Sequence, residues 1–120
     1  MMEKEILNAI ICSASIDDGD RGILNSMIDL DYGGAHQGFG GYCLYLPKSY
    51  SNNSQSASFN YAGVWIWRVM EVAGVTRWKD LPGKTVRADI REGMIYGIGH
   101  IIKDDWFYPK EVFAEAETRT

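Results

Sequence analysis

The sequence predicts an α+β fold, a mostly antiparallel β-sheet with one main helix packed on a face and a short C-terminal helix. Three observations predict it. The segment 61–75 carries a helical period of apolar residues, and several other segments alternate between apolar and polar residues. Strands and helices also do not alternate along the chain, as they would in a doubly wound parallel sheet. The 120 residues correspond to a single domain, 1–120.

The chain begins with two predicted strands, at 5–16 and 23–32. The intervening DDGDRG (17–22) is typical of a turn, because Asp and Gly tolerate tight and left-handed backbone. The second strand alternates clearly, and its better inward-facing set is Leu24, Ser26, Ile28, Leu30 and Tyr32. We therefore expect an antiparallel hairpin or meander.

A third strand is predicted at 38–47, where it opens with glycines and stops at Pro47. The segment 48–60 is rich in Ser and Asn and has no apolar period. It predicts a flexible loop.

The main helix is predicted at 61–75. Asn60 or Ser58 can cap its start, and Gly74 fits the position just after its end. Its apolar arc contains Ala62, Ile66, Val69, Met70 and Ala73, with Trp65 and Val72 at the edge, and Arg68 and Glu71 on the outer face. Trp67 also lies on the wet side, which indicates either a ring packed under a loop or a subunit interface.

Two further strands are predicted at 84–91 and 94–102, joined by a tight turn at Glu92-Gly93. In the first of them, Val86, Ala88 and Ile90 share one face, while Arg87, Asp89 and Arg91 share the other. A short helix is predicted at 109–117, because its first residue is a proline.

Composition excludes several functions. Sixteen acidic residues against 12 basic ones give a net charge of −4, which disfavours binding to DNA or to anionic membranes. No run of 18 apolar residues predicts a membrane span, and the N-terminus lacks the basic flank of a signal peptide. Cys12 and Cys43 permit a disulfide but do not require one, and we expect reduced thiols in a cytoplasmic protein.

The stretch GGAHQGFGGY (33–42) is half glycine. It is not a P-loop, and it lacks both the third glycine and the following helix of a dinucleotide-binding fingerprint. Glycines let a ligand approach backbone N–H groups closely, so the stretch suits an anion. The alternative is a bulge or a tight strand crossing.

Other groups suited to a nucleotide are spread along the chain. The predicted helix start, Tyr61-Ala62-Gly63, offers free N–H groups and the positive end of the helix dipole. Arginine binds phosphate with two parallel hydrogen bonds, and aromatic rings stack on a base. The basic candidates are Arg21, Arg87, Arg91 and Lys103, and the aromatic candidates are Phe39, Tyr61, Trp106 and Phe107.

A metal site or an enzyme is not expected. His36 and His100 could join Asp104 or Asp105 as ligands, but their spacing matches no diagnostic metal motif. His100 could also act as a base with Asp104, yet no nucleophile elbow or paired-carboxylate motif accompanies it. We therefore expect no cofactor and no catalysis.

Several motifs occur together in an order that resembles one family. These are QGFGGY (37–42), EVAGV (71–75), W-x-D-L-P-G-K-x-V-R (78–87) and I-G-H-x-x-K-D-x-W-F-x-P (98–109). The family's leading D-x-G-I-L is approximated by GDRGIL (19–24), where Arg21 departs from the family pattern. With these motifs the chain resembles the first type of Thoeris anti-defence protein, from phages and prophages, over nearly its whole length.

This resemblance implies a function. Such proteins sequester, without cleaving, the cyclic ADP-ribose isomers that bacterial TIR-domain enzymes make as an alarm signal, and some relatives also bind cyclic oligonucleotides. It further implies a homo-oligomer, a dimer that can assemble into a hexamer, in the host bacterial cytoplasm. The resemblance does not identify the individual contact residues. The candidate ligand-binding set is Arg21, Gln37, Phe39, Gly40, Gly41, Tyr61, Ala62, Gly63, Arg87, Arg91, His100, Lys103 and Trp106.

A small single-sheet domain hardly encloses such a ligand alone. We therefore expect a pocket shared between subunits, with the Trp67 side of the helix or the sheet edge as the contact. The alternative function is a protein–protein interaction inhibitor that blocks a host complex through its acidic surface, which includes Asp17, Asp18, Asp20, Asp29 and Asp31.

Overall fold

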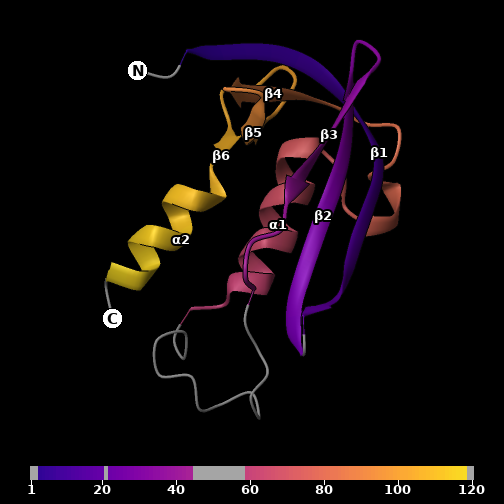
Figure 1. The fold of residues 1–120 in the computed structure, drawn as a ribbon. Helices are drawn as coiled ribbons and strands as arrows, with labels where there is room; N and C mark the ends of the chain where they lie inside the picture. The colour runs from indigo at the N-terminus through magenta and orange to yellow at the C-terminus, as the bar shows by residue number, and fades with distance from the viewer. Residues whose placement is uncertain (1–2, 21, 45–58, 119–120) are drawn as a thin grey trace.

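The computed structural model describes residues 3–20, 22–44 and 59–118 (Figure 1). Its strands and helices confirm the predicted α+β class. They are β1 (Lys4–Asp20), β2 (Ile23–Tyr32), β3 (Ala35–Gly40), α1 (Tyr61–Ala73), a 3-10 turn (Trp78–Asp80), β4 (Thr85–Arg91), β5 (Met94–Gly99), β6 (Trp106–Phe107) and α2 (Pro109–Thr118).

The strands form one antiparallel sheet in the order β3-β2-β1-β4-β5-β6. The long strand β1 joins its two halves, because its first part pairs with β4 and its later part with β2. Helix α1 packs against one face of the sheet, and the sheet curls so that β3 contacts β5 (Figure 1). The face that α1 covers is called the inner face below, and the opposite one the outer face.

Strand β1 carries a bulge at Cys12, since Ile11 pairs with Leu30 whereas Ser13 pairs with Asp29. The extra residue changes which side chains of β1 face the helix, from odd-numbered residues before the bulge to even-numbered ones after it. It explains why the first predicted strand alternates only loosely. On β2 the predicted inward set is confirmed, with Ser26, Ile28 and Leu30 buried.

Several predicted boundaries differ from the structure. Strand β1 runs through most of DDGDRG to Asp20. The third strand lies at 35–40, and residues 41–44 of the predicted strand 38–47 are not part of it, while 45–47 lie outside the described residues. Strand β6 was not predicted. The predicted loop 48–60 lies mostly outside the described residues.

The core is aromatic where α1 meets the sheet. Trp65 on α1 stacks on Phe39, with ring centroids 5.3 Å apart, and meets Phe107 at 5.7 Å. The buried stripe of α1 is centred on Trp65, Val69 and Val72, so the predicted arc was rotated toward Ile66 and Met70, which are only partly buried. Neither helix in the described part of the chain is long and apolar enough to cross a membrane.

Candidate functional site

The glycine-rich stretch shapes the backbone of β2 and β3. Gly33 and Gly34 form the two-residue turn between these strands, with φ of 73° and 89°, as the favoured hairpin turn requires. Gly40 lies so close to β2 that a Cβ there would sit 2.3 Å from the Ser26 carbonyl oxygen, and the Gly41 N–H donates to that oxygen at 2.9 Å. The tight-crossing alternative therefore accounts for Gly40 and Gly41 within this chain.

Two aromatic candidates belong to the core. Phe39 and Tyr61 are almost completely buried, at 1% and 2% exposure, so neither offers a free ring face for stacking. Burial in the core therefore gives no support to base stacking on either ring, and ligand contact at these two positions stays a prediction. Gln37 is half-buried and lies on the same face of β3 as Phe39.

The start of α1 is closed by its own cap. Asn60 Oδ1 accepts from the Gly63 N–H at 2.7 Å, and the Asn60 carbonyl accepts from the Val64 N–H at 2.9 Å. These bonds confirm Asn60 as the predicted cap. Because the Asn60 side chain also fills the space beside Gly63, and Ala62 is buried, this helix end is a poor phosphate acceptor.

Three other candidates come together on the outer face of β4, β5 and β6. Arg87 lies over the Trp106 ring at 4.8 Å, and Trp106 stacks on Tyr108 with centroids 5.9 Å apart and planes 14° from parallel. Arg91 lies 4.1 Å from the centroid of Tyr96 and 5.9 Å from that of Tyr108. We call these five residues, Arg87, Arg91, Tyr96, Trp106 and Tyr108, the arginine–aromatic surface.

Glycines on β5 make room for this surface. A Cβ at Gly97 would lie 2.4 Å from Tyr108 Cδ1, and one at Gly99 would lie 2.5 Å from Trp106 Cδ2. The two rings can therefore lie flat on the sheet only because β5 has no side chains at these positions.

The buried carboxylate of Asp89 anchors two residues of this surface, Arg91 and Tyr108. Asp89 is fully buried and accepts from Arg91 Nε and Nη2, each at 3.1 Å, and from the Tyr108 hydroxyl at 2.7 Å. Burial, aided by the hydrogen bond to Asp89, raises the pKa of Tyr108 to about 12. The hydrogen bond to Asp89 also raises the pKa of Arg91, whose guanidinium is thus charged and fixed in place.

His100 and Lys103 contact this surface through their backbone carbonyl groups, which accept hydrogen bonds from Arg87. Arg87 donates from Nε to the His100 carbonyl at 2.7 Å and from Nη2 to the Lys103 carbonyl at 2.8 Å. The His100 Nδ1 accepts from the backbone N–H groups of Ile102 and Lys103, both at 3.0 Å. This nitrogen stabilises a turn, which disfavours the alternative role of His100 as a base paired with Asp104.

Sequence reasoning missed Tyr96, Tyr108 and Lys110. Lys110 Nζ lies 6.0 Å from the Tyr96 ring centroid. Lys110 also lines a pocket of about 240 Å³ formed by α2, the start of α1 and the residues that follow β3. The other residues that line it are Tyr42, Cys43, Tyr61, Phe113, Ala114 and Glu117. The alternation of β4 places Arg87 and Arg91 on one face, but no sequence signal marked the strand β6 that brings Trp106 and Tyr108 beside them. Arg21 lies outside the described residues.

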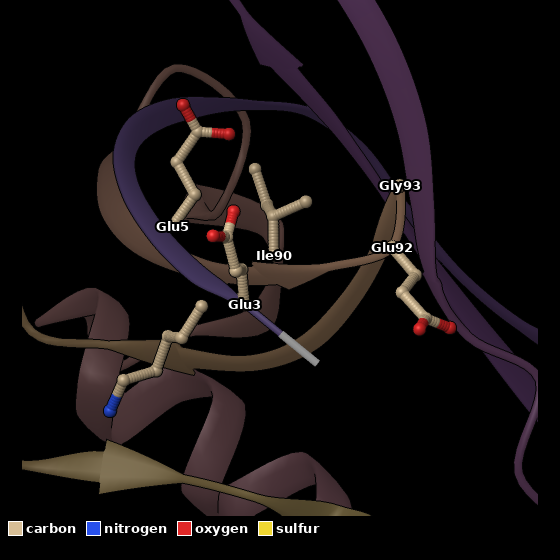
Figure 2. Close-up of a pocket in the computed structure, with 6 residues that line it drawn as sticks. Glu3, Glu5, Ile90, Glu92 and Gly93 are labelled. Atoms are coloured by element: carbon tan, nitrogen blue, oxygen red, sulfur yellow. The ribbon is translucent and has the colours of Figure 1, made fainter. Parts of the chain in front are cut away.

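A second hollow, of about 590 Å³, lies beside the β4–β5 turn and is lined by Glu3, Lys4, Glu5, Ile90, Glu92 and Gly93. Figure 2 shows the carboxylates of Glu3 and Glu5 on one side of Ile90 and that of Glu92 on the other. Three carboxylates against one ammonium repel a diphosphate. This hollow therefore suits a basic group rather than a nucleotide.

Comparison of the chain with protein-family models, curated proteins and solved structures finds no match. The geometry of the outer face therefore carries the functional argument together with the motifs of the sequence.

Proposed function

We propose that this protein is a non-enzymatic inhibitor of bacterial immunity, encoded by a phage, that sequesters cyclic ADP-ribose-type signalling nucleotides without cleaving them. The arginine–aromatic surface carries the proposal, because two guanidinium groups contact three neighbouring aromatic rings there. Such a ligand needs cations for two phosphates and a ring face for adenine. The resemblance to Thoeris anti-defence proteins supports this ligand class and a location in the host cytoplasm.

The two arginines retain hydrogen-bonding capacity for phosphate. Their hydrogen bonds to the described residues use Nε and Nη2, so the Nη1 group of each guanidinium takes no part in these bonds. Asp89 and the carbonyl acceptors already fix both side chains, which lowers the entropy lost when a ligand binds. Lys110, beside Tyr96, adds a third positive charge.

Tight sequestration requires more enclosure than one open surface gives. A nanomolar complex corresponds to about −12 kcal/mol, and ligands held so tightly are largely buried. We therefore propose that the pocket is completed by a second copy, in a dimer that can assemble into a hexamer. The Trp67 side of α1 is one proposed contact, since Trp67 is 64% exposed and lines an apolar hollow with Met70, Glu71, Val75 and Thr76.

The test is to mix the protein with a cyclic ADP-ribose isomer, measure binding by calorimetry, then denature it by heat and analyse the released ligand. Intact ligand supports sequestration, and degraded ligand would mean catalysis. Trp106→Ala should weaken binding by about 1–3 kcal/mol through lost stacking. Arg91→Lys keeps a cation beside Asp89 but loses the planar fork, and should also weaken binding.

Arg77→Ala is the matched control, because Arg77 is exposed, pairs with Asp80 and is not one of the five residues of the arginine–aromatic surface. If Arg77→Ala lowers affinity as much as Trp106→Ala and Arg91→Lys do, the surface is not the site. Competition with cyclic di- and trinucleotides shows whether the same surface also takes cyclic oligonucleotides.

The alternative function, inhibition of a host complex through an acidic surface, is favoured by the hollow that contains Glu3, Glu5 and Glu92. It predicts stable capture of a basic host protein and no nucleotide binding in calorimetry. Glu92→Lys would abolish that capture, while it would leave nucleotide sequestration intact.

A further inference from the structure

Four metal-binding side chains meet on the outer face of β1, β2 and β3, away from the arginine–aromatic surface. Cys12 comes from the bulge in β1, Asp29 and Asp31 from β2, and His36 from β3, where it pairs directly with Asp31. One donor atom each from Cys12, Asp31 and His36 lies within 4.8 Å of the other two.

The distances come close to those of a tetrahedral centre. His36 Nε2 lies 3.9 Å from Asp31 Oδ2. Cys12 Sγ lies 4.0 Å from the other ring nitrogen, Nδ1, so the imidazole must turn slightly before Nε2 faces both donors. Zinc–ligand bonds of about 2.0–2.3 Å place neighbouring donor atoms roughly 3.4–3.6 Å apart. The side chains are exposed, with His36 at 54% and Asp31 at 33%, so they can close the remaining gap of about 1 Å by small rotations.

Asp29 orients the imidazole. Its Oδ2 lies 3.4 Å from His36 Nδ1. A proton on Nδ1 donated to Asp29 leaves the lone pair of Nε2 facing Asp31, which is the arrangement that a metal-binding histidine uses. The carboxylates of Asp29 and Asp31 also concentrate negative charge around His36 and the Cys12 thiol. A cation would relieve that repulsion.

We propose that Cys12, Asp31 and His36 bind Zn²⁺, with Asp29 as the carboxylate that positions His36 and water in the fourth position. Sulfur, nitrogen and oxygen donors together select zinc over Mg²⁺ and Ca²⁺, which prefer six or more oxygen ligands. The ion links three neighbouring strands and so ties the β2–β3 hairpin to β1. This proposal does not depend on the nucleotide ligand.

The test titrates the metal-free full-length chain with Zn²⁺ by calorimetry, and with Co²⁺ as a spectroscopic substitute. We expect one Zn²⁺ per chain, no binding of Mg²⁺, and a thiolate-to-cobalt absorption band with the ligand-field spectrum of a tetrahedral site. Cys12→Ser should abolish the thiolate band and weaken Zn²⁺ binding at least tenfold. His36→Gln should also weaken Zn²⁺ binding at least tenfold.

Cys43→Ser is the matched control, since Cys43 is the other free and exposed cysteine and lies outside the cluster. It should leave Zn²⁺ affinity and the cobalt spectrum unchanged. Asp29→Asn should keep the thiolate band and weaken binding about 10–100-fold, as the loss of a positioning carboxylate does. Absence of Zn²⁺ binding, or equal loss in Cys12→Ser and Cys43→Ser, would overturn the proposal. Circular dichroism of each variant confirms that it is folded.

Discussion

Residues on the inner face of the sheet form the core, whereas residues on the outer face form the candidate ligand-binding surface. Phe39 illustrates the inner face, because its ring is buried and stacks on Trp65. A sequence cannot distinguish such a core ring from a ligand-stacking ring when both follow glycines. Because Phe39 is buried in the core, we expect its ring to stabilise the fold.

Phe39→Ala should lower the free energy of unfolding by about 3–5 kcal/mol, as the loss of a buried aromatic ring does. Ile102→Ala is the control, since that side chain is 83% exposed and its truncation should cost far less. Chemical denaturation monitored by circular dichroism measures both. Equal effects of the two substitutions would contradict the assignment of Phe39 to the core.

On the outer face, Tyr108 makes stability depend on alkaline pH. Its pKa rises from 10 in the unfolded chain to about 12 in the fold. The folded state thus holds this proton more tightly, and the resulting stability is complete below pH 10 and is lost as pH rises through about 12. We expect the unfolding free energy to fall over this interval.

The comparison is Tyr108→Phe, which removes the titrating hydroxyl but keeps the ring. Its unfolding free energy should decline less between pH 10 and 12 than that of the wild type. A difference measurement is required, because burial also raises the pKa of Tyr42 and Tyr61. Parallel curves for the two proteins would show that the Tyr108–Asp89 bond does not contribute.

At the scale of elements, the sequence predicted correctly the helix ends and turns that depend only on neighbouring residues. The start of α1 at Tyr61, its cap Asn60 and its left-handed end at Gly74 follow from neighbouring residues, and the structure confirms them. The turn at Glu92-Gly93 is confirmed for the same reason, with φ of 52° and 78°. These features need no contact from distant parts of the chain.

Elements that depend on distant partners escaped prediction. Strand β6 has only two residues, and it exists because Trp106 and Phe107 pair with the end of β5. The bulge at Cys12 likewise arises from pairing with β2, and it hides the alternation of β1. The candidate site was therefore predicted only in part: Arg87, Arg91 and Trp106 were named, but not the rings that join them.

The crossing at Gly40 gives an element-scale prediction. Gly40→Ala would place a Cβ against the Ser26 carbonyl at a φ of 141°, and should cost more than about 1 kcal/mol of stability. Gly34→Asn is the control, because no atom lies within 4 Å of its Cβ position and Asn tolerates a left-handed turn. Thermal melts should therefore separate the two variants. A melting temperature for Gly40→Ala at or above that of Gly34→Asn would show that this crossing can relax.

For the whole molecule, the sheet order could not be derived from the sequence. Strand β1 pairs with β2 on one side and with β4 on the other, and these two partners are far from each other along the chain. In the strand order, the arginine–aromatic surface lies at one end of the sheet and the predicted glycine stretch at the other, although the curl of the sheet brings β3 into contact with β5. The described residues of one chain leave the arginine–aromatic surface partly exposed, and we propose that a second copy covers it.

Sedimentation velocity tests that expectation. We expect the protein at micromolar concentration to sediment as more than a monomer, and Trp67→Glu to shift it toward the monomer by placing a charge in the proposed contact. Glu71→Lys, on the same side of α1, should act in the same direction. A wild-type protein that sediments only as a monomer would remove the argument for a shared pocket.

The long strand β1 belongs to both halves of the sheet. The bulge at Cys12 shifts the inward–outward alternation of its side chains by one residue between the part beside β4 and the part beside β2 alone. Loss of a single residue between positions 13 and 18 would force β1 either to give up this bulge or to turn its far part over, while the part next to β4 kept its facing. We therefore expect the chain to tolerate substitutions along β1 better than changes in its length.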